Sequence, residues 1–413
     1  MKDILLFTPI DENVRGQREF VPLGLLYISS YLSSKGFEVD ILHDTFDKIK
    51  PGYKFYGISS TTSQYSRCKR ALNFIRKIEP TAKVILGGAH LNAPISVKVG
   101  LNDGWDYLVI GEGEEAVLRI LTDPTLDRVV HGTMILDLDS LPFPDYNKLN
   151  LNDYSFPIGD GSKCINIITS RGCPYACAFC STSRTKLRQR SPDNILEEIN
   201  LLKSKYQFES FMFVDDTMSI KKQRYLSILD GLKQINTKWR SYGRVNVLDR
   251  ECLENMVDSG CLEVAIGVES GNQEILDLIG KGTNVQKNIE FTNLCRDIGL
   301  KCNAMIIVGL PNESPKTIQD TRYWVEKARP AAFGYNILFP FPDSPLVRDY
   351  NIWKDKITIY PYDWDFAFTK AANKVQQCYV STPYLSREEI LQAYQSNFDA
   401  FVSITGFDPR IRN

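Results

Sequence analysis

Short apolar segments alternate with helical stretches twice along the 413-residue chain. In the first series we expect strands at 3–7, 37–42, 55–59, 83–87 and 107–111, with helices over 22–34 and 67–79 and from about 114. Strands that alternate with helices pair in parallel, because each helix returns the chain to the same end of the sheet. The pattern predicts an α/β domain over residues 1–125, built on a doubly wound (Rossmann-like) parallel sheet.

The second series has strand patterns at 164–169, 210–214, 241–246, 262–267, 302–308 and 333–339. Ser191 and Pro192 form a typical N-cap and first helical residue for one of the helices between them. Six such units are two short of a closed eight-unit barrel, so residues 163–345 are predicted to form an open, partial (β/α)6 barrel. A linker rich in Pro and Asp is expected at 126–162. A short, aromatic-rich C-terminal extension with a helix from about 386 is expected at 346–413.

Charge and hydropathy exclude some classes of protein. Lys and Arg number 49 against 50 Asp and Glu, which argues against a general electrostatic grip on nucleic acid. No apolar run approaches the roughly 20 residues needed to span a bilayer, and the first residues lack a secretory signal pattern. We therefore expect a cytoplasmic protein whose ten cysteines are metal ligands and buried thiols rather than disulfides.

Three cysteines, Cys173, Cys177 and Cys180, follow the first strand of the second series with CxxxCxxC spacing. Thiolates are soft ligands that select zinc, copper(I) or iron–sulfur clusters. Three ligands are one short of the usual four, which leaves a coordination position open for a substrate or cofactor. In β/α barrels the chemistry lies at the carboxyl ends of the strands, where this loop begins.

A structural zinc is the alternative for this loop, and it would need a fourth ligand. The candidate histidines His43, His90 and His131 are remote in sequence, although folding can still bring one close. Cys164 is nearer but opens the preceding strand, roughly 16 Å from its far end at about 3.3 Å per residue. Cys164 is therefore not expected to reach the metal.

Small and hydroxylated residues follow three strands of the first series. They include Ser59 and Thr61, Gly87 and Gly88, and Gly111 with Glu112. Ligands of doubly wound sheets bind at the carboxyl ends of the strands, and such residues suit a large, flat ligand lying across them. The alternative is that the glycines only make tight turns. No GxGxxG motif follows the first strand, so a dinucleotide is not expected.

The run Arg171-Gly-Cys-Pro-Tyr-Ala-Cys-Ala-Phe-Cys180 resembles the cluster motif of the radical SAM superfamily. The segments 21–27 and 109–114 resemble the N-terminal domain of its cobalamin-binding branch. The resemblance covers roughly residues 1–345. It implies a [4Fe-4S] cluster on the three cysteines, S-adenosylmethionine on the open iron, and cobalamin on the first domain. Reductive cleavage of S-adenosylmethionine would release a 5′-deoxyadenosyl radical.

The same resemblance assigns further cofactor contacts. Glu269 resembles the fourth-strand residue that contacts the ribose or amino end of S-adenosylmethionine, and Gly309 the turn that supports the adenosyl group. Phe179 is similar to the residue whose surroundings pack near the adenine, and Arg244 could pair with the carboxylate through its fork of donors. The alternative for Glu269 and Arg244 is an ordinary buried ion pair. For Asp215 and Asp216, metal or substrate contact competes with helix N-capping.

The resemblance implies a cobalamin-dependent enzyme that methylates an unactivated carbon. Its substrate would be a small molecule or a peptide, and its electrons would come from an external flavodoxin- or ferredoxin-type reductant. The DxHxxG motif is absent, so cobalt would lack a histidine ligand from that motif. Two alternatives stay open: a radical enzyme that cyclises or rearranges its substrate without methyl transfer, and a corrinoid- or zinc-binding protein that is not an enzyme.

Overall fold

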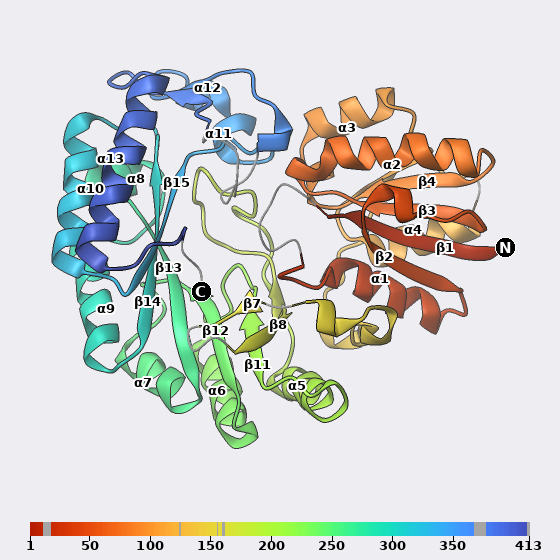
Figure 1. Cartoon of the computed structure of the whole chain (residues 1–413), viewed down its shortest axis with the longest axis horizontal. Coiled ribbons are helices and arrows are strands. Elements are labelled where there is room, and N and C mark those ends of the chain that lie inside the picture. The colour runs from red at the N-terminus through yellow and green to blue at the C-terminus, as the bar shows by residue number, and fades with distance from the viewer. Residues whose placement is uncertain (11–17, 124, 155, 159–161, 367–376, 411–413) are drawn as a thin grey trace. The chain divides into compact units, whose positions relative to one another are not determined.

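The computed structural model describes residues 1–10, 18–123, 125–154, 156–158, 162–366 and 377–410. The chain forms two compact units, which are described separately (Figure 1). The first comprises Met1–Tyr154 with Asp363–Lys370, and the second Ser155–Tyr362 with Ala371–Asn413. No helix in the described residues is both long and apolar enough to cross a membrane.

The first unit is built on a six-stranded parallel sheet. Its order is β2 (Val39–Asp44), β1 (Lys2–Pro9), β3 (Tyr53–Ser59), β4 (Lys83–Gly87), β5 (Tyr107–Ile110) and β6 (Val129–His131). The order reverses direction at β1, between β2 and β3, which makes the sheet doubly wound. The predicted fold class is confirmed, with one strand more than the five expected.

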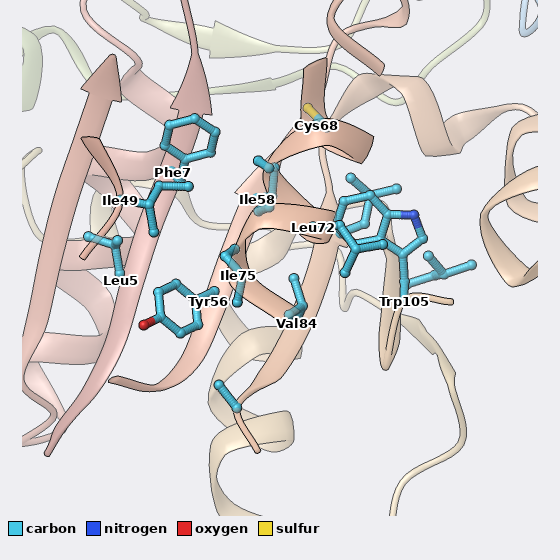
Figure 2. Close-up of a cluster of buried hydrophobic side chains, with 14 of the residues drawn as sticks. Leu5, Phe7, Ile49, Tyr56, Ile58, Cys68, Leu72, Ile75, Val84 and Trp105 are labelled. Carbon is cyan, nitrogen blue, oxygen red and sulfur yellow. The ribbon is translucent and has the colours of Figure 1, made fainter. Parts of the chain in front are cut away.

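Helices cover both faces of this sheet. Leu5 and Phe7 of β1 pack with residues of α2 (Tyr65–Ile78), in the core that also contains Trp105, as Figure 2 shows. Ile4 and Leu6 point to the opposite face, toward α1 (Leu23–Ser34) and α4 (Gly113–Thr122). Burial on both faces explains why the strands read as nearly continuous apolar runs rather than alternating ones.

The second unit contains six parallel strands in sequential order. They are β8 (Lys163–Ile167), β11 (Ser210–Phe213), β12 (Lys238–Gly243), β13 (Cys261–Glu269), β14 (Lys301–Val308) and β15 (Ala332–Ile337). The short β7 (Phe156–Pro157) pairs antiparallel with β8 at one edge. Among the described residues β8 and β15 do not pair with each other, so the sheet does not close into a full barrel. This open sheet agrees with the predicted partial (β/α)6 barrel.

Helices link the strands of the second unit along the outside of the sheet (Figure 1). The helices between β8 and β15 are α5 (Pro192–Tyr206), α6 (Lys222–Ile235), α7 (Arg250–Asp258), α8 (Gln273–Leu278), α9 (Val285–Asp297) and α10 (Pro315–Ala328). Ser191 caps α5 as predicted, because its side chain accepts a hydrogen bond from the Asn194 amide. The final helix α13 (Arg387–Thr405) begins with a capping box and packs Phe398 and Phe401 against Phe333 of β15.

One strand prediction is displaced. β12 spans Lys238–Gly243 rather than 241–246, because the charged residues at its start hid the strand pattern. Arg240 is nevertheless buried, where it pairs with Glu263 of β13 at 2.9 Å. The earlier end of β12 places Arg244 directly after the strand.

The structure also distributes the predicted linker, 126–162, between the two units. β6 joins the first sheet, and 3-10 turns at Leu138–Ser140, Tyr146–Lys148 and Leu151–Asp153 belong to the same unit. β7 joins the second sheet. From the predicted C-terminal extension, the turn Trp364–Phe366 belongs to the first unit, where Asp365 accepts hydrogen bonds from Ser66 at 2.6 and 2.7 Å.

Candidate cofactor site

The three cysteines lie on a loop closed by a short antiparallel pair, β9 (Ser170–Arg171) with β10 (Arg188–Gln189). Gly172 leaves β9 with φ +89°, a conformation that residues with a Cβ rarely adopt. Cys173 donates its amide to the Thr185 hydroxyl at 2.8 Å and accepts from the Thr185 amide at 2.9 Å. The loop is thus fixed at its first metal ligand by the strand pair and by Thr185.

Segments that follow other strands hold the middle of the loop. Ala178 donates its amide to the carbonyl of Ile279 at 2.9 Å and accepts from the amide of Leu346 at 2.9 Å. The amide of Cys180 donates to the carbonyl of Cys177 at 3.2 Å, which forms the tight turn around Ala178 and Phe179. Backbone hydrogen bonds therefore fix the loop independently of any bound group.

Each cysteine sulfur has a polar neighbour. Arg244 Nη1 lies 3.6 Å from Cys177 Sγ, Thr217 Oγ1 lies 3.8 Å from Cys173 Sγ, and Thr182 Oγ1 lies 3.3 Å from Cys180 Sγ. Burial raises the pKa of the Cys180 thiol. A metal bound there would stabilise the thiolate against this cost of burial.

The cysteine loop fits a cluster. Among the described residues, no three His, Cys, Asp or Glu side chains are gathered as ligands of a single metal ion. The donor set is what fits: an iron–sulfur cluster is held by Cys thiolates on separate iron atoms, and Cys173, Cys177 and Cys180 on one loop are three free thiols that could supply three of its four ligands.

Asp215, which follows β11, fixes the start of the cysteine loop. Its carboxylate accepts hydrogen bonds from the amide and hydroxyl of Thr169 at 2.8–3.1 Å and from the Ser170 hydroxyl at 2.5 Å. Burial raises the pKa of this carboxyl, and the bonds from Ser170 and Thr169 oppose the rise. Asp216 accepts from Thr182 at 3.2 Å. Helix N-capping is therefore wrong for both, since Lys221 is the N-cap of the following helix, α6.

Glu269 lies at a bulge in β13 with φ +63°, an uncommon backbone conformation for a residue with a Cβ. Its carboxylate pairs with the Lys281 ammonium at 2.6 Å, and both side chains are buried. Arg244 instead contacts the cysteine loop. The expected ion pair therefore exists at Glu269, but its partner is Lys281, which the sequence did not single out.

Gly309 directly follows β14 with φ +90°, a backbone conformation that favours glycine. Its amide donates to the side chain of Glu313, which is fully buried. Burial raises the pKa of Glu313 to about 8, and bonds from the amides of Gly309 and Leu310 oppose the rise. Phe179, in the turn between the second and third cysteines, is half-buried.

The carboxyl ends of β3 and β4 meet in the first unit. Ser60 donates its amide to the carbonyl of Gly87 at 2.9 Å, which joins the Ser59–Thr61 segment to the Gly87–Gly88 turn. Gly88 has φ +96°, and a Cβ there would lie 2.6 Å from the Ser60 carbonyl oxygen. Thr61 forms a capping box with Gln64. The structure thus brings these four predicted residues to one short stretch of the sheet edge, where Gly88 packs directly against the backbone of Ser60.

Gly111 and Glu112 follow the next strand, β5. Gly111 has φ +86°, and the Glu112 carboxylate accepts from the amide of Ile135 at 2.9 Å. The carboxylate of Glu112 therefore fixes, through this hydrogen bond, the segment that follows β6.

The three histidines all lie in the first unit. His43 Nδ1 is 2.9 Å from the Tyr154 hydroxyl, and the ring of His90 lies against Tyr65 and Trp364, with centroids 4.5 and 4.6 Å apart. Burial lowers the pKa of His43 and of His90 to about 4. Both are neutral, packed side chains.

Comparisons with known proteins identify the two units. Residues 17–121 match the B12 binding domain, and residues 167–325 match the radical SAM superfamily. An uncharacterized methyltransferase of Pyrococcus horikoshii is 26% identical over 79% of this chain and 77% of its own. The anaerobic magnesium-protoporphyrin IX monomethyl ester cyclase of Rubrivivax gelatinosus is 24% identical over 92% of this chain and 73% of its own.

The fold is shared with a solved structure. This structure is of TsrM, a radical S-adenosylmethionine methyltransferase from Kitasatospora setae, with cobalamin and a [4Fe-4S] cluster bound. The two chains superpose with a TM-score of 0.71 at 15% sequence identity, over 99% of this chain and 90% of TsrM. A B12 binding domain followed by a radical SAM domain defines the class. The chain therefore contains a radical SAM domain preceded by a B12 binding domain, the combination expected from its resemblance to the cobalamin-binding branch of that superfamily. Its predicted cofactors, a [4Fe-4S] cluster, S-adenosylmethionine and cobalamin, are confirmed at the level of these domains.

Several residues of the site were missed from the sequence. Lys281 lies between Gly280 and Gly282, both with positive φ, and this Gly-Lys-Gly turn was the signal available for it. Thr182, on the loop, and Thr217, after β11, contact cysteine sulfurs, and the sequence held no signal for either beyond proximity to a cysteine or to Asp216. Only the fold shows which of them meet.

Proposed function

We propose that this protein is a cobalamin-dependent radical SAM enzyme that methylates an unactivated carbon. One observation carries the proposal: a B12 binding domain precedes, in the same chain, a radical SAM domain with its three-cysteine loop. When bound, the cluster and S-adenosylmethionine supply a carbon-centred radical oxidant, and cobalamin supplies a methyl carrier. Methyltransferases among the relatives support the reaction type.

The residues of the chain position these groups. Cys173, Cys177 and Cys180 would hold the cluster at the open face of the barrel. Glu269, paired with Lys281, would contact the ribose or amino end of S-adenosylmethionine. Gly309 and Phe179 would lie near the adenosyl group. The positive φ of Gly309 permits the turn after β14, where a Cβ would lie 3.1 Å from the side chain of Val380.

In the first unit the ends of β3, β4 and β5 would bind cobalamin. Ser59, Thr61, Gly87, Gly88, Gly111 and Glu112 are the proposed contacts. An edge of small residues suits a large planar ligand, and the close packing of Gly88 against the Ser60 backbone fixes the turns that form this edge. His43 and His90 are packed against aromatic rings, so the proposal assigns neither to cobalt.

A small-molecule or peptide substrate, a flavodoxin- or ferredoxin-type electron donor and a cytoplasmic location complete the proposal. The test is anaerobic purification from cobalamin-fed cells, with iron, sulfide and corrinoid quantified, followed by product analysis. Methylation predicts both 5′-deoxyadenosine and S-adenosylhomocysteine, and transfer of deuterium from S-adenosylmethionine labelled in its methyl group. Turnover that yields neither nucleoside product contradicts it.

Ring formation without methyl transfer is the second candidate, favoured by the similarity to the cyclase of Rubrivivax gelatinosus over 92% of this chain. Turnover that yields 5′-deoxyadenosine without S-adenosylhomocysteine would identify this reaction instead. A colourless protein that holds zinc and no iron would contradict both candidates.

A further inference from the structure

Arg244 is a buried cation beside the cysteine loop. It is the first residue after β12, its exposed fraction is 7%, and its Nη1 lies 3.6 Å from the sulfur of Cys177. Arginine keeps its charge at any physiological pH. A permanent positive charge therefore lies in direct contact with one of the three cluster ligands.

Two further contacts fix the orientation of this guanidinium. The Cζ atom of Arg244 lies 3.7 Å from the centroid of the Tyr175 ring, a close cation–π contact. Tyr175 is on the same loop as the cysteines. The Nη2 of Arg244 donates to the carbonyl of Lys281, after β13. Arg244 thus connects three elements, and the arrangement holds its Nη1 at Cys177.

The third nitrogen of Arg244, Nε, is buried and has no hydrogen-bond partner among the described residues. A buried, unpaired N–H group is costly, so it points to an acceptor that a bound group would supply. The inorganic sulfides of a cluster, or its cysteine ligands in the loaded state, are such acceptors. Hydrogen bonds to cluster sulfurs are among the features that set the reduction potential of an iron–sulfur protein.

We propose that Arg244 sets the reduction potential of the cluster by donating to Cys177, and that Tyr175 holds it in place. The inference rests on the cluster of the proposed function. One-electron reduction by the external donor adds one negative charge to the cluster. A neighbouring positive charge and an N–H donor stabilise that added charge and so make the potential less negative.

This role differs from the one expected by resemblance, in which Arg244 binds the carboxylate of S-adenosylmethionine. The two roles predict different measurements. A carboxylate contact affects the affinity for S-adenosylmethionine and leaves the potential of the cluster alone unchanged. A contact to Cys177 affects the potential in the absence of S-adenosylmethionine.

The experiment is an EPR-monitored redox titration of the reconstituted full-length protein without S-adenosylmethionine, with the Kd for S-adenosylmethionine measured separately on the oxidised protein. Arg244→Gln removes the charge. At a fixed solution potential we expect the ratio of reduced to oxidised cluster to fall by about 10- to 100-fold, the equivalent of one hydrogen bond to a charged group. Arg244→Lys keeps the charge and should give a smaller fall. The Kd should stay unchanged in both variants.

Arg240→Gln is the matched control. Arg240 is also buried in β12, but it pairs with Glu263 and lies over Phe156 rather than the cysteine loop. This variant should lower the melting temperature and leave the cluster potential at the wild-type value. Should Arg244→Gln fail to fold or to hold iron, Tyr175→Leu decides the question. The Tyr175→Leu variant keeps Arg244 but removes the aromatic ring that holds its guanidinium, so it should shift the potential in the same direction.

The possible outcomes are distinct. A wild-type potential in Arg244→Gln or in Tyr175→Leu, with iron retained, overturns the inference, and a raised Kd for S-adenosylmethionine would then assign Arg244 to the carboxylate. An equal shift in Arg240→Gln also overturns it, because the effect would then be general. A wild-type protein that holds no iron–sulfur cluster contradicts the proposed function itself.

Discussion

The parallel sheets of the two units differ in the chemical groups that form their carboxyl edges. The first edge is mostly backbone, with glycines in positive-φ turns, such as Gly88 and Gly111, and short hydroxylated residues. The second is made of side chains that carry charge or sulfur, such as the three cysteines, Arg244 and the Glu269–Lys281 pair. An edge of backbone can accept a broad flat ligand, whereas an edge of reactive side chains can hold a metal cluster.

Removing a cluster ligand should have the largest effect and should affect the second edge alone. Cys173→Ala, Cys177→Ala or Cys180→Ala should abolish iron binding and cleavage of S-adenosylmethionine, because two thiolates cannot hold the cluster. Cobalamin binding should persist. The matched control is Cys164→Ala in β8, the strand before the loop. The buried thiol of Cys164 donates to the Phe156 carbonyl. Iron and corrinoid analysis checks both variants, and lost corrinoid in Cys173→Ala would contradict the independence of the two edges.

The converse change is Gly88→Ala in the first edge. Its Cβ would lie 2.6 and 2.7 Å from the carbonyl oxygen and amide nitrogen of Ser60, so the turn must shift. We expect cobalamin affinity to fall by at least about tenfold, equivalent to about 1.4 kcal/mol, with iron content unchanged. Gly104→Ala shares a positive φ but meets nothing within 4 Å, so it separates backbone strain from crowding. Equal losses of affinity in the two variants would argue against a built ligand edge at Gly88.

The buried ion pair of the second edge should be costly to break. Lys281→Met leaves the Glu269 carboxylate buried without its cation, which we expect to lower the free energy of unfolding by about 3–5 kcal/mol. Lys222→Met removes an exposed pair with Asp249 and should cost no more than about 1 kcal/mol. Chemical denaturation measures both. A cost for Lys281→Met as small as that for Lys222→Met would mean that water reaches the pair.

The last effect, which appears only as the pH rises, concerns Glu313, whose pKa burial raises from 4.5 to about 8. Between these two values the folded protein holds a proton that the unfolded chain releases, so the free energy of unfolding falls as the pH rises. Glu313→Gln should remove this loss and melt higher than wild type above pH 8, by about 2–4 °C for each kcal/mol recovered. Melting curves from pH 5 to 9 test this. Parallel curves for the two proteins would show that Glu313 is ionised in the folded state.

Much of the fold could be predicted from the sequence because its signals are local. Alternating strands and helices gave both parallel sheets, and Ser191 with Pro192 gave the start of α5. The predicted start of β12 was wrong, because charged residues such as Lys238 and Arg240 are typical of exposed positions. Burial of Arg240 depends on Glu263, a neighbour only in the folded sheet.

The site divides in the same way. Spacing alone placed Cys173, Cys177 and Cys180 on one loop, since ligands so close in sequence need no fold to bring them together. The partners of Arg244 and Glu269 were not predictable: Cys177 and Tyr175 lie on the cysteine loop, far in sequence from Arg244, and Lys281 is separated from Glu269 by helix α8. Resemblance suggested what each residue binds, but the contacts assign Arg244 to the cysteine loop.

By itself, the sequence determined the two parallel sheets, the cysteine loop and, through its resemblance, the superfamily, because periodicity, ligand spacing and motif are properties of neighbouring residues. Only the tertiary structure decided which charges meet: Glu269 with Lys281, and Arg244 with Cys177. It also joined Asp365 to Ser66 across 299 positions of the chain. Such pairs depend on strand order and register, which bring distant residues within a few ångströms in a way that no local pattern encodes.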